Sequence, residues 1–414
     1  MIFYQSSRLC KHRRLFLFSV VPVTTRNLSN VDNFKQLHSI VIYLPLGDWY
    51  VGKTGGDMME ILKDILAALS GVLNGLPQGL LAMAFGFASV PTALAFVAGA
   101  AGNAVTGSVA VISFQAETIT VAGTMGKNLR ERLSMIFYGA AIMFLIGAFG
   151  LLERIIEWIG PVITSGMMAG VGIMLTKVAW DMAKGDKAVG IVSFASALVT
   201  YMATQDLVYT ITISVVLSSV VAYFVNKDKE DSEKKPFTKE RLVLQKFTIN
   251  PMVIRGALAM VCLNIGANIA FGNINGSIAG RDVNVDILAM ISSLADMASA
   301  LFGGGPVEVI ISATASAPHP VWSGVLMMVL MAIILFAGLL PKIGKYIPTA
   351  SIAGFLFVLG AIVTLPGNAA AAIGGDGSSG IVGAMTMVVT AITDPFVGML
   401  SGIIIEFLIG IFGF

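Results

Sequence analysis

The apolar positions of this chain fall into long runs, without the alternation that marks half-buried strands. From residue 59 onward there are two series of runs, separated by one charged segment at 226–246. The first series covers 65–87, 90–106, 108–126, 133–152, 159–180, 188–204 and 207–225, and the second covers 252–274, 284–302, 306–318, 321–340, 345–365, 378–393 and 395–413. Because about 20 apolar residues cross a bilayer, this pattern predicts an all-α polytopic membrane protein with fourteen transmembrane segments.

The two series resemble each other in the same order along the chain. GLLERIIEWIGPVITSG from Gly150 matches GLLPKIGKYIPTASIAG from Gly338, so that Gly172 and Thr176 correspond to Gly360 and Thr364. A copy with seven spans, an odd number, places the next copy upside down in the membrane. The chain therefore divides into a first seven-span repeat (59–225), a connecting loop (226–250) and a second, inverted repeat (251–414). Inverted repeats with a site at their interface are typical of secondary transporters.

Two segments inside the third and tenth runs read as strands. SVAVISF from Ser108 matches PVEVIIS from Pro306, and both have glycine or proline close to their entries. Broken backbone at membrane depth survives only when it is buried against protein or lines a cavity. We therefore expect 108–113 and 306–311 to pair antiparallel near the midplane, each starting a half-helix whose N–H groups face a polar or anionic solute. The alternative, two ordinary apolar helices, is disfavoured by the glycines and prolines.

Composition narrows the class of function. The chain is 56% hydrophobic and 12% charged, with a mean hydropathy of +0.86, whereas soluble domains carry about 25% charged residues. A net charge of +2 gives no indication of nucleic-acid binding, and two cysteines and three histidines provide no metal, redox or cofactor framework. An intramembrane enzyme would need a nucleophile–base or metal set that these residues do not supply. A continuous channel rarely needs two broken helices.

Residues 1–58 read as a non-native or disordered extension. They have a basic start and a short apolar run, but no small-residue cleavage site follows. Gly55-Gly56-Asp57 can be encoded by a bacterial ribosome-binding sequence directly ahead of Met58 and Met59. We therefore expect translation to begin at one of these methionines, and the protein to lie in a bacterial inner membrane.

The segment LADMASALFGGGPVEVIISATASAPHP from Leu294, with the GLLPKIG segment that follows it, resembles the nucleobase-cation symporter-2 family of uracil, xanthine and guanine–hypoxanthine permeases. The resemblance extends from Met59 to Phe414 and is strongest over 284–365. It implies a core domain (spans 1–4 and 8–11), a gate domain (spans 5–7 and 12–14) and short strands in spans 3 and 10. It further implies alternating-access uptake of a purine or pyrimidine base with protons or sodium, in a cell membrane, and it admits a homodimer.

The chain departs from that family at two positions. Known members place a carboxylate in span 8 and a Glu or Gln early in span 10, where this chain has Leu263 or Asn264 and Ser312. The alternative is an inorganic or organic anion transporter of the same seven-plus-seven fold. Many sulfate-type carriers add a soluble domain after the last span, and because this sequence ends at Phe414 we expect a nucleobase permease.

Four amides are the first candidates for contacting the substrate. Asn264 and Asn268 are four residues apart and share a helix face, and their repeat partners Asn74 and Gln78 have the same spacing. Amides offer both donors and acceptors, as a planar heterocycle requires. The alternative is hydrogen bonding between helices.

The residues that follow the two strands are the second set of candidates. Gln115 and Glu117 follow the first strand, and Glu117 is the only ionisable residue between Leu66 and Gly126, so we expect it to couple the proton or cation. Glu308 in the second strand is a further ion-coupling candidate. Its side chain could face the site or form an ion pair with a basic residue. Ser312 and Thr314 could line the site or bond the broken backbone. We expect Asp296 to have a structural role and His319 to lie in a loop.

Basic residues cluster in alternate loops, at 127–132, 181–187, 227–246 and 341–345. The positive-inside rule predicts that these loops are cytoplasmic, whereas the family resemblance implies cytoplasmic termini. We expect the charged segment 226–246 to connect the two halves and to pack little.

Overall fold

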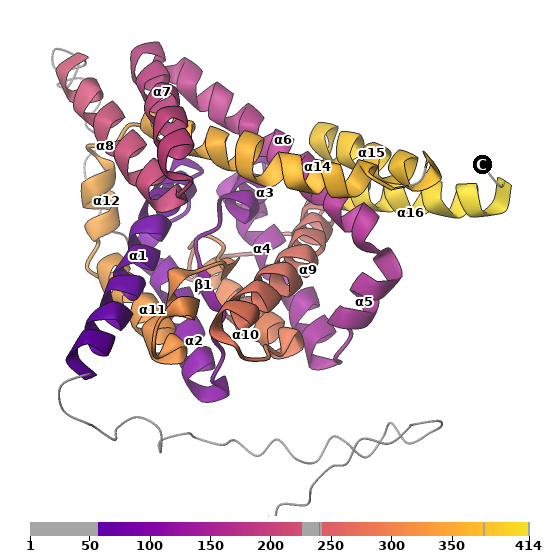
Figure 1. The fold of residues 1–414 in the computed structure, drawn as a ribbon, viewed down its shortest axis with the longest axis horizontal. Helices are drawn as coiled ribbons and strands as arrows, with labels where there is room; N and C mark the ends of the chain where they lie inside the picture. The colour runs from indigo at the N-terminus through magenta and orange to yellow at the C-terminus, as the bar shows by residue number, and fades with distance from the viewer. Residues whose placement is uncertain (1–56, 226–239, 241, 376, 413–414) are drawn as a thin grey trace, which may run out of the picture. The chain divides into compact units, whose positions relative to one another are not determined.

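The computed structural model describes residues 57–225, 240, 242–375 and 377–412. Almost all of the predicted extension 1–58, and most of the charged segment 226–246, lie outside the described residues. The first half consists of α1 (Asp57–Ala84), α2 (Ser89–Thr106), β1 (Val111–Ser113), α3 (Ala116–Met125), α4 (Leu129–Ala148), α5 (Leu152–Ile159), α6 (Pro161–Gly185), α7 (Lys187–Thr204) and α8 (Leu207–Val225). Figure 1 shows these elements in indigo to magenta.

The second half repeats this order. It consists of α9 (Pro251–Ala279), α10 (Val285–Leu301), β2 (Glu308–Ile310), the 3₁₀ turn η1 (Ala313–Ser316), α11 (Pro320–Phe336), α12 (Leu339–Gly344), α13 (Thr349–Phe357), the π-helix η2 (Val358–Thr364), α14 (Leu365–Ile373), α15 (Gly377–Ile392) and α16 (Pro395–Phe412). Within the described part of the chain, nine helices are long and apolar enough to cross a membrane. Each predicted run contains one helix, one broken strand segment, or the continuous series α13–η2–α14. The predicted seven-plus-seven order is confirmed.

The two predicted strands are present and pair antiparallel, as expected. Val111 lies opposite Ile310, and Ser113 lies opposite Glu308. Every residue of both strands is buried. Only one edge of each strand faces the other, so the remaining backbone groups need partners elsewhere.

Side chains from neighbouring helices supply those partners. Asn103 of α2 donates to the carbonyl of Ala110 at 2.7 Å. Asn275 of α9 donates to the carbonyl of Ile310 at 2.7 Å and accepts from the N–H of Ser312 at 3.1 Å. Asp296 of α10 accepts from the N–H of Val307 at 2.7 Å. The broken backbone is thus bonded by buried polar side chains.

The three glycines before β2 have specific geometric causes. Gly303 has φ +95°, a left-handed conformation that glycine adopts without steric cost. A Cβ on Gly304 would lie 2.3 Å from Ser299 Oγ and 2.6 Å from the backbone nitrogen of Thr92. The chain therefore enters the tenth span through a turn that only residues without a side chain can make.

The predicted second half-helix is absent, which corrects the expectation of two opposed half-helices. β1 is followed by α3, ten residues long, but β2 is followed only by η1, a single turn of four residues. The Ser312 hydroxyl accepts from the N–H of Thr314 at 3.2 Å and fixes that turn. Pro318 and Pro320 follow too closely for a longer helix to form.

The helices pack in two groups. The helices α1, α2, α4, α9, α10 and α11 pack around the strands, whereas α6, α7, α8 and α13 to α16 pack mainly with one another. In Figure 1, α6, α14, α15 and α16 lie beside one another, apart from β1. The repeat-related residues Gly172 of α6 and Gly360 of η2 meet where these two spans cross. A Cβ on Gly360 would lie 2.6 Å from the carbonyl oxygen of Gly172, and a Cβ on Gly172 would lie 2.9 Å from that of Gly360.

The connecting segment packs more than expected, at least in its described residues. The carboxylate of Glu240 accepts from the Val90 N–H at 2.7 Å and from the Ser89 hydroxyl at 2.9 Å, which caps the start of α2. The Gln245 N–H donates to the carbonyl of Leu301 at 2.8 Å. The expectation that this segment packs little is therefore wrong for its last residues, because they satisfy helix ends that have no partner of their own.

Candidate functional site

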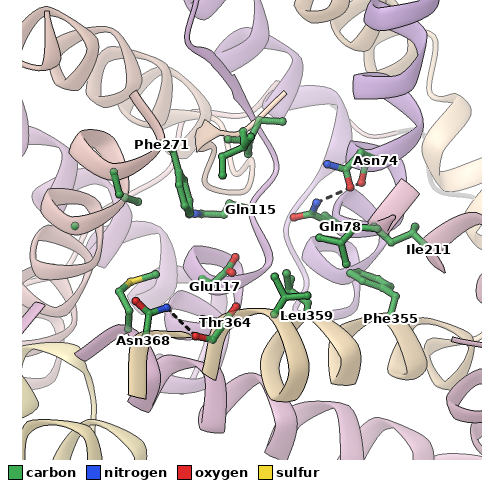
Figure 2. Close-up of a pocket in the computed structure, with 18 residues that line it drawn as sticks. Asn74, Gln78, Gln115, Glu117, Ile211, Phe271, Phe355, Leu359, Thr364 and Asn368 are labelled. Carbon is green, nitrogen blue, oxygen red and sulfur yellow. Dashed lines mark hydrogen bonds between the residues drawn. The ribbon is translucent and has the colours of Figure 1, made fainter. Parts of the chain in front are cut away.

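A cavity of about 270 Å³ lies between the two groups of helices. Figure 2 shows its lining. The side that carries the strands contributes Asn74 and Gln78 from α1, Gln115 and Glu117 beside the start of α3, one face of α9, and the end of β2. The opposite side contributes Met168, Leu207, Ile211, Phe355, Leu359, Val363, Thr364 and Asn368. The cavity is thus shared by both groups and by both repeats.

The start of α3 provides the polar end of the cavity. Gln115 is the N-cap residue in extended backbone, and its own side chain does not cap the helix. The first intrahelical bond runs from the Ile119 N–H to the Gln115 carbonyl at 3.0 Å, so the earlier N–H groups of the first turn have no intrahelical partner. These groups and the helix dipole favour negative charge.

The Gln115 amide has a defined orientation. Its carbonyl oxygen accepts a hydrogen bond from the Thr118 hydroxyl one turn later, which leaves its Nε2 group as the free donor. That nitrogen is buried and has no hydrogen-bond partner among the described residues, and the whole residue is only 3% exposed. A buried donor without a partner costs free energy of about 1–3 kcal/mol, so its presence beside a cavity indicates a ligand or water in that cavity.

Two amides of α1 and one carboxyl group complete the polar lining. The Gln78 side chain donates to the backbone carbonyl of Asn74 at 3.3 Å. The Glu117 carboxyl group turns toward its own backbone N–H and lies beside the Thr364 hydroxyl. Asn368 donates to the carbonyl of Thr364 at 2.7 Å, across the π-helical turn. No Lys, Arg or His is among the lining residues.

The other predicted amides lie outside this cavity. Asn264 and Asn268 are buried in α9, with 4% and 0% exposure, but the lining face of that helix is formed by Gly266, Ala267, Ala270 and Phe271. Both amides retain buried atoms without partners. Their predicted contact with substrate therefore has no support from the cavity.

The predicted residues of the tenth span also face elsewhere. Glu308 is fully buried beside Asn268 and Ser292, and one of its oxygens accepts from the Val309 N–H at 3.1 Å. Among the described residues, no basic side chain forms an ion pair with Glu308. Ser312 and Thr314 bond each other at 2.9 Å and stabilise the broken backbone, which is the second of the two roles expected for them.

Sequence reasoning overlooked the contribution of the twelfth span. Thr364 and Asn368 come from the end of η2 and the start of α14, whereas the candidates predicted from sequence all lay in spans 1, 3, 8 and 10. The signal in the sequence was Pro366-Gly367, directly after the apolar run 345–365. Such breaks interrupt helices, and π-helical turns are frequent at functional sites.

His319 was expected in a loop but has a defined partner. It is the N-cap residue of α11, and its Nδ1 lies 2.8 Å from an oxygen of Asp64, a buried carboxylate of α1. Asp64 also accepts from the His319 N–H at 2.9 Å. The pair closes the end of the broken tenth span against α1.

Three solved structures have a fold similar to that of this chain. No protein-family model matches the chain, and no curated protein does. The transmembrane domain of the cyanobacterial bicarbonate transporter BicA is similar with a TM-score of 0.62 at 12% identity, over 83% of this chain and 97% of that one. Murine Slc26a9, an anion transporter in its inward-facing state, is similar with a TM-score of 0.67 at 15% identity, over 94% and 77%. A further SLC26A9 structure has a TM-score of 0.62 at 13% identity, over 85% and 66%.

At these identities the likeness concerns the fold. The chain is a multi-pass integral membrane protein with the seven-plus-seven inverted-repeat fold of these transporters.

The expected nucleobase permease is wrong, because the similar structures are bicarbonate and anion transporters. The resemblance that suggested a nucleobase permease rested on the LFGGGP segment from Leu301 and on the pattern of apolar runs. Gly303 and Gly304 are required by backbone geometry, so this motif reports the fold and carries no information about the solute. The informative positions were Leu263 or Asn264 in span 8 and Ser312 in span 10, which lack the carboxylate and the Glu or Gln that the resemblance implied. The purine, xanthine and uracil assignments are withdrawn with it.

Proposed function

We propose that this protein is a secondary transporter of small anions, which bind at the start of α3. The observation that carries the proposal is the Gln115 Nε2 group, a buried donor without a partner that lines the cavity at the N-cap of a ten-residue helix. A helix N-terminus with free N–H groups is a ready anion site. The likeness of the fold to bicarbonate and anion transporters supports the same class of solute.

The proposed site binds charge with dipoles. Because no basic side chain lines the cavity, the attraction comes from backbone N–H groups, the α3 dipole and the amide of Gln115, with Asn74 and Gln78 as further polar contacts. A site without a fixed cation binds an anion with moderate affinity. Moderate affinity suits a carrier, because a carrier must also release its solute. The apolar side chains Phe271, Ile211 and Phe355 exclude water around the polar end.

The two groups of helices fit the division into a core domain and a gate domain. Spans 1–4 and 8–11, which contain the strands, would form the core, and spans 5–7 and 12–14 would form the gate. The cavity at their boundary is where a solute must lie if the groups move against each other to expose it to each side in turn. Transport of this kind requires no covalent chemistry, so we propose a carrier and no enzyme.

Uptake into proteoliposomes tests the proposal. The full chain is reconstituted, and uptake of radiolabelled bicarbonate, sulfate, chloride and formate is measured, with uracil as a neutral control. We expect saturable uptake of at least one anion, absent from protein-free liposomes and reduced in Gln115→Leu. The surface variant Asn273→Ala is the matched control, since Asn273 is exposed on α9. If properly inserted protein moves none of the four anions, the proposal fails.

A further inference from the structure

Glu117 is an acidic residue that lines the cavity proposed to bind anions. Among the described residues that line the cavity it is the only ionisable one, and it is 6% exposed. It lies in the first turn of α3, two positions after the N-cap, and its carboxyl group turns toward its own backbone N–H. The side chain therefore reaches the same helix N-terminus that would receive the solute.

A carboxylate at this position competes with any incoming anion. Both would use the N–H groups at the start of α3, and two negative charges in contact in a poorly hydrated cavity repel each other strongly. Thr364 provides a second partner on the opposite side of the cavity. Because the Thr364 hydroxyl can donate to the ionised or the protonated carboxyl group, the Glu117 side chain keeps a hydrogen-bond partner when it leaves the helix N-terminus.

No nearby charge relieves this competition. Helices α1, α4, α6 and α9 pack against α3. In α1, Glu60 and Lys63 are exposed and Asp64 pairs with His319. In α4, Arg130 and Arg132 donate to backbone carbonyls, and Glu131 accepts from Lys127 and Asn250.

The remaining charged groups are also committed or remote from the lining. In α6, Lys177 is exposed, and Lys184 pairs with Asp181. In α9, Arg255 pairs with Asp394. Glu308 on β2 faces Asn268 and Ser292, and η2 and α14 contain no ionisable residue. Within the described structure, no charged side chain is left to neutralise Glu117 in place.

We infer that Glu117 is a tethered competitor for the anion site, so that one proton enters with each anion. This inference rests on the proposed anion transport. A proton from water on the loading side binds a carboxyl oxygen of Glu117, and the neutral side chain yields the α3 N–H groups to the anion. On the release side the anion leaves, the proton returns to water, and the carboxylate turns back to its own N–H. Transport of a monovalent anion is then electroneutral.

Flux under separately imposed gradients tests the inference. In proteoliposomes that transport a monovalent anion, here formate or chloride, an acidic exterior should drive accumulation, whereas a potassium–valinomycin potential should not. Glu117→Gln should lose accumulation driven by the proton gradient, and its remaining anion flux should follow the membrane potential. Glu157→Gln, an exposed carboxylate of α5, should retain the coupling of the parent protein.

A second measurement needs no variant of the site. A pH-sensitive dye trapped inside liposomes with unmodified protein should report acidification when an inward anion gradient is imposed at zero potential. If the anion enters and the interior pH does not change, the inference is overturned while anion transport stands. The same holds if Glu117→Gln keeps proton-driven accumulation. If no anion enters under any gradient, the proposed function itself has failed.

Discussion

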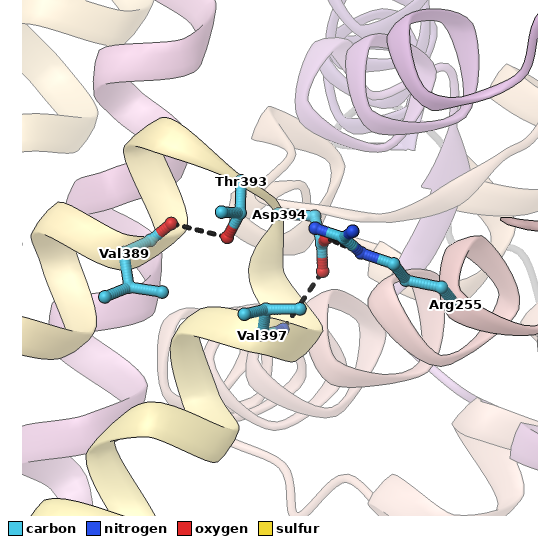
Figure 3. Close-up of polar contacts among 5 residues, drawn as sticks. All are labelled: Arg255, Val389, Thr393, Asp394 and Val397. Carbon is cyan, nitrogen blue, oxygen red and sulfur yellow. Dashed lines mark hydrogen bonds and ion pairs between the residues drawn. The ribbon is translucent and has the colours of Figure 1, made fainter.

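Arg255 Nε lies 2.5 Å from Asp394 Oδ2 and joins the first turn of α9 to the turn between α15 and α16 (Figure 3). Asp394 is fully buried, whereas the Arg255 side chain is 40% exposed. The other oxygen of Asp394 accepts from the Val397 N–H at 3.0 Å and caps α16. In the proposed division, this ion pair connects the core domain to the gate domain.

Replacing Arg255 with glutamine should destabilise the protein and loosen this connection. Loss of one partner of a buried pair costs about 3–5 kcal/mol, and the exposure of Arg255 reduces that to about 1–3 kcal/mol through solvent screening. Thermal unfolding in detergent should show a lower midpoint than for Arg281→Gln, an exposed arginine at the end of α9. Equal midpoints for the two variants would show that the pair contributes nothing.

Gln115→Leu should weaken anion binding without unfolding the protein. The leucine keeps a similar volume but removes the free donor at the start of α3. Hydrogen bonds to charged groups contribute about 1.5–3 kcal/mol, so the apparent KM for the transported anion should rise about 10- to 150-fold. Concentration-dependent uptake gives this value. An unchanged KM in a well-folded variant would place the anion elsewhere in the cavity.

Gly304→Ala should disrupt the entry to the tenth span. The added methyl group would overlap Ser299 Oγ and the Thr92 nitrogen, and overpacking of this kind costs about 1–3 kcal/mol. Gly367→Ala is the matched control, because a Cβ there meets nothing within 4 Å. The yield of monodisperse protein and the unfolding temperature should fall for Gly304→Ala only. A fully stable Gly304→Ala protein would contradict the described close approach.

Glu240→Ala should destabilise the start of α2. The carboxylate supplies the cap that Ala88, the N-cap residue, lacks, and loss of a cap costs about 0.5–2 kcal/mol. Glu153→Ala, on the exposed face of α5, should be neutral in the same unfolding assay. Deletions that include Glu240 or Gln245 should be harmful, although the sequence predicted a segment that packs little. If Glu240→Ala does not change the unfolding temperature, the carboxylate does not stabilise the start of α2.

The arrangement of spans and strands could be predicted because it depends on local patterns. Apolar run length fixes the spans, and the glycines before β2 mark a break that the backbone geometry requires. The matches between halves predicted which strands pair, because an inverted copy makes equivalent strands antiparallel. The length of the second half-helix was missed because Ser312 and the two prolines end it after one turn, an outcome of specific hydrogen bonds and ring sterics.

The site could be predicted only in part. Gln115 and Glu117 were found because a polar residue beside a strand break has few structural uses. Asn264 and Asn268 were assigned to the site by spacing alone, but spacing places two residues on one face without saying where that face points. The rotation of α9 is set by packing against other helices. Thr364 and Asn368 belong to the opposite group of helices, and the Pro366-Gly367 break beside them does not reveal that Thr364 lies beside Glu117.

The crossing of Gly172 and Gly360 has a consequence for how this protein moves. A joint made of two backbones has no side chains whose rotamers can change, so α6 and η2 cannot slide by exchanging one interdigitated arrangement for another. A Cβ on either glycine would lie within 2.9 Å of the other's carbonyl oxygen, so the two backbones already approach closely. In the proposed division, the helices assigned to the gate should therefore behave as one stiff frame, and the displacement proposed to carry the anion across should fall on the spans that hold the strands.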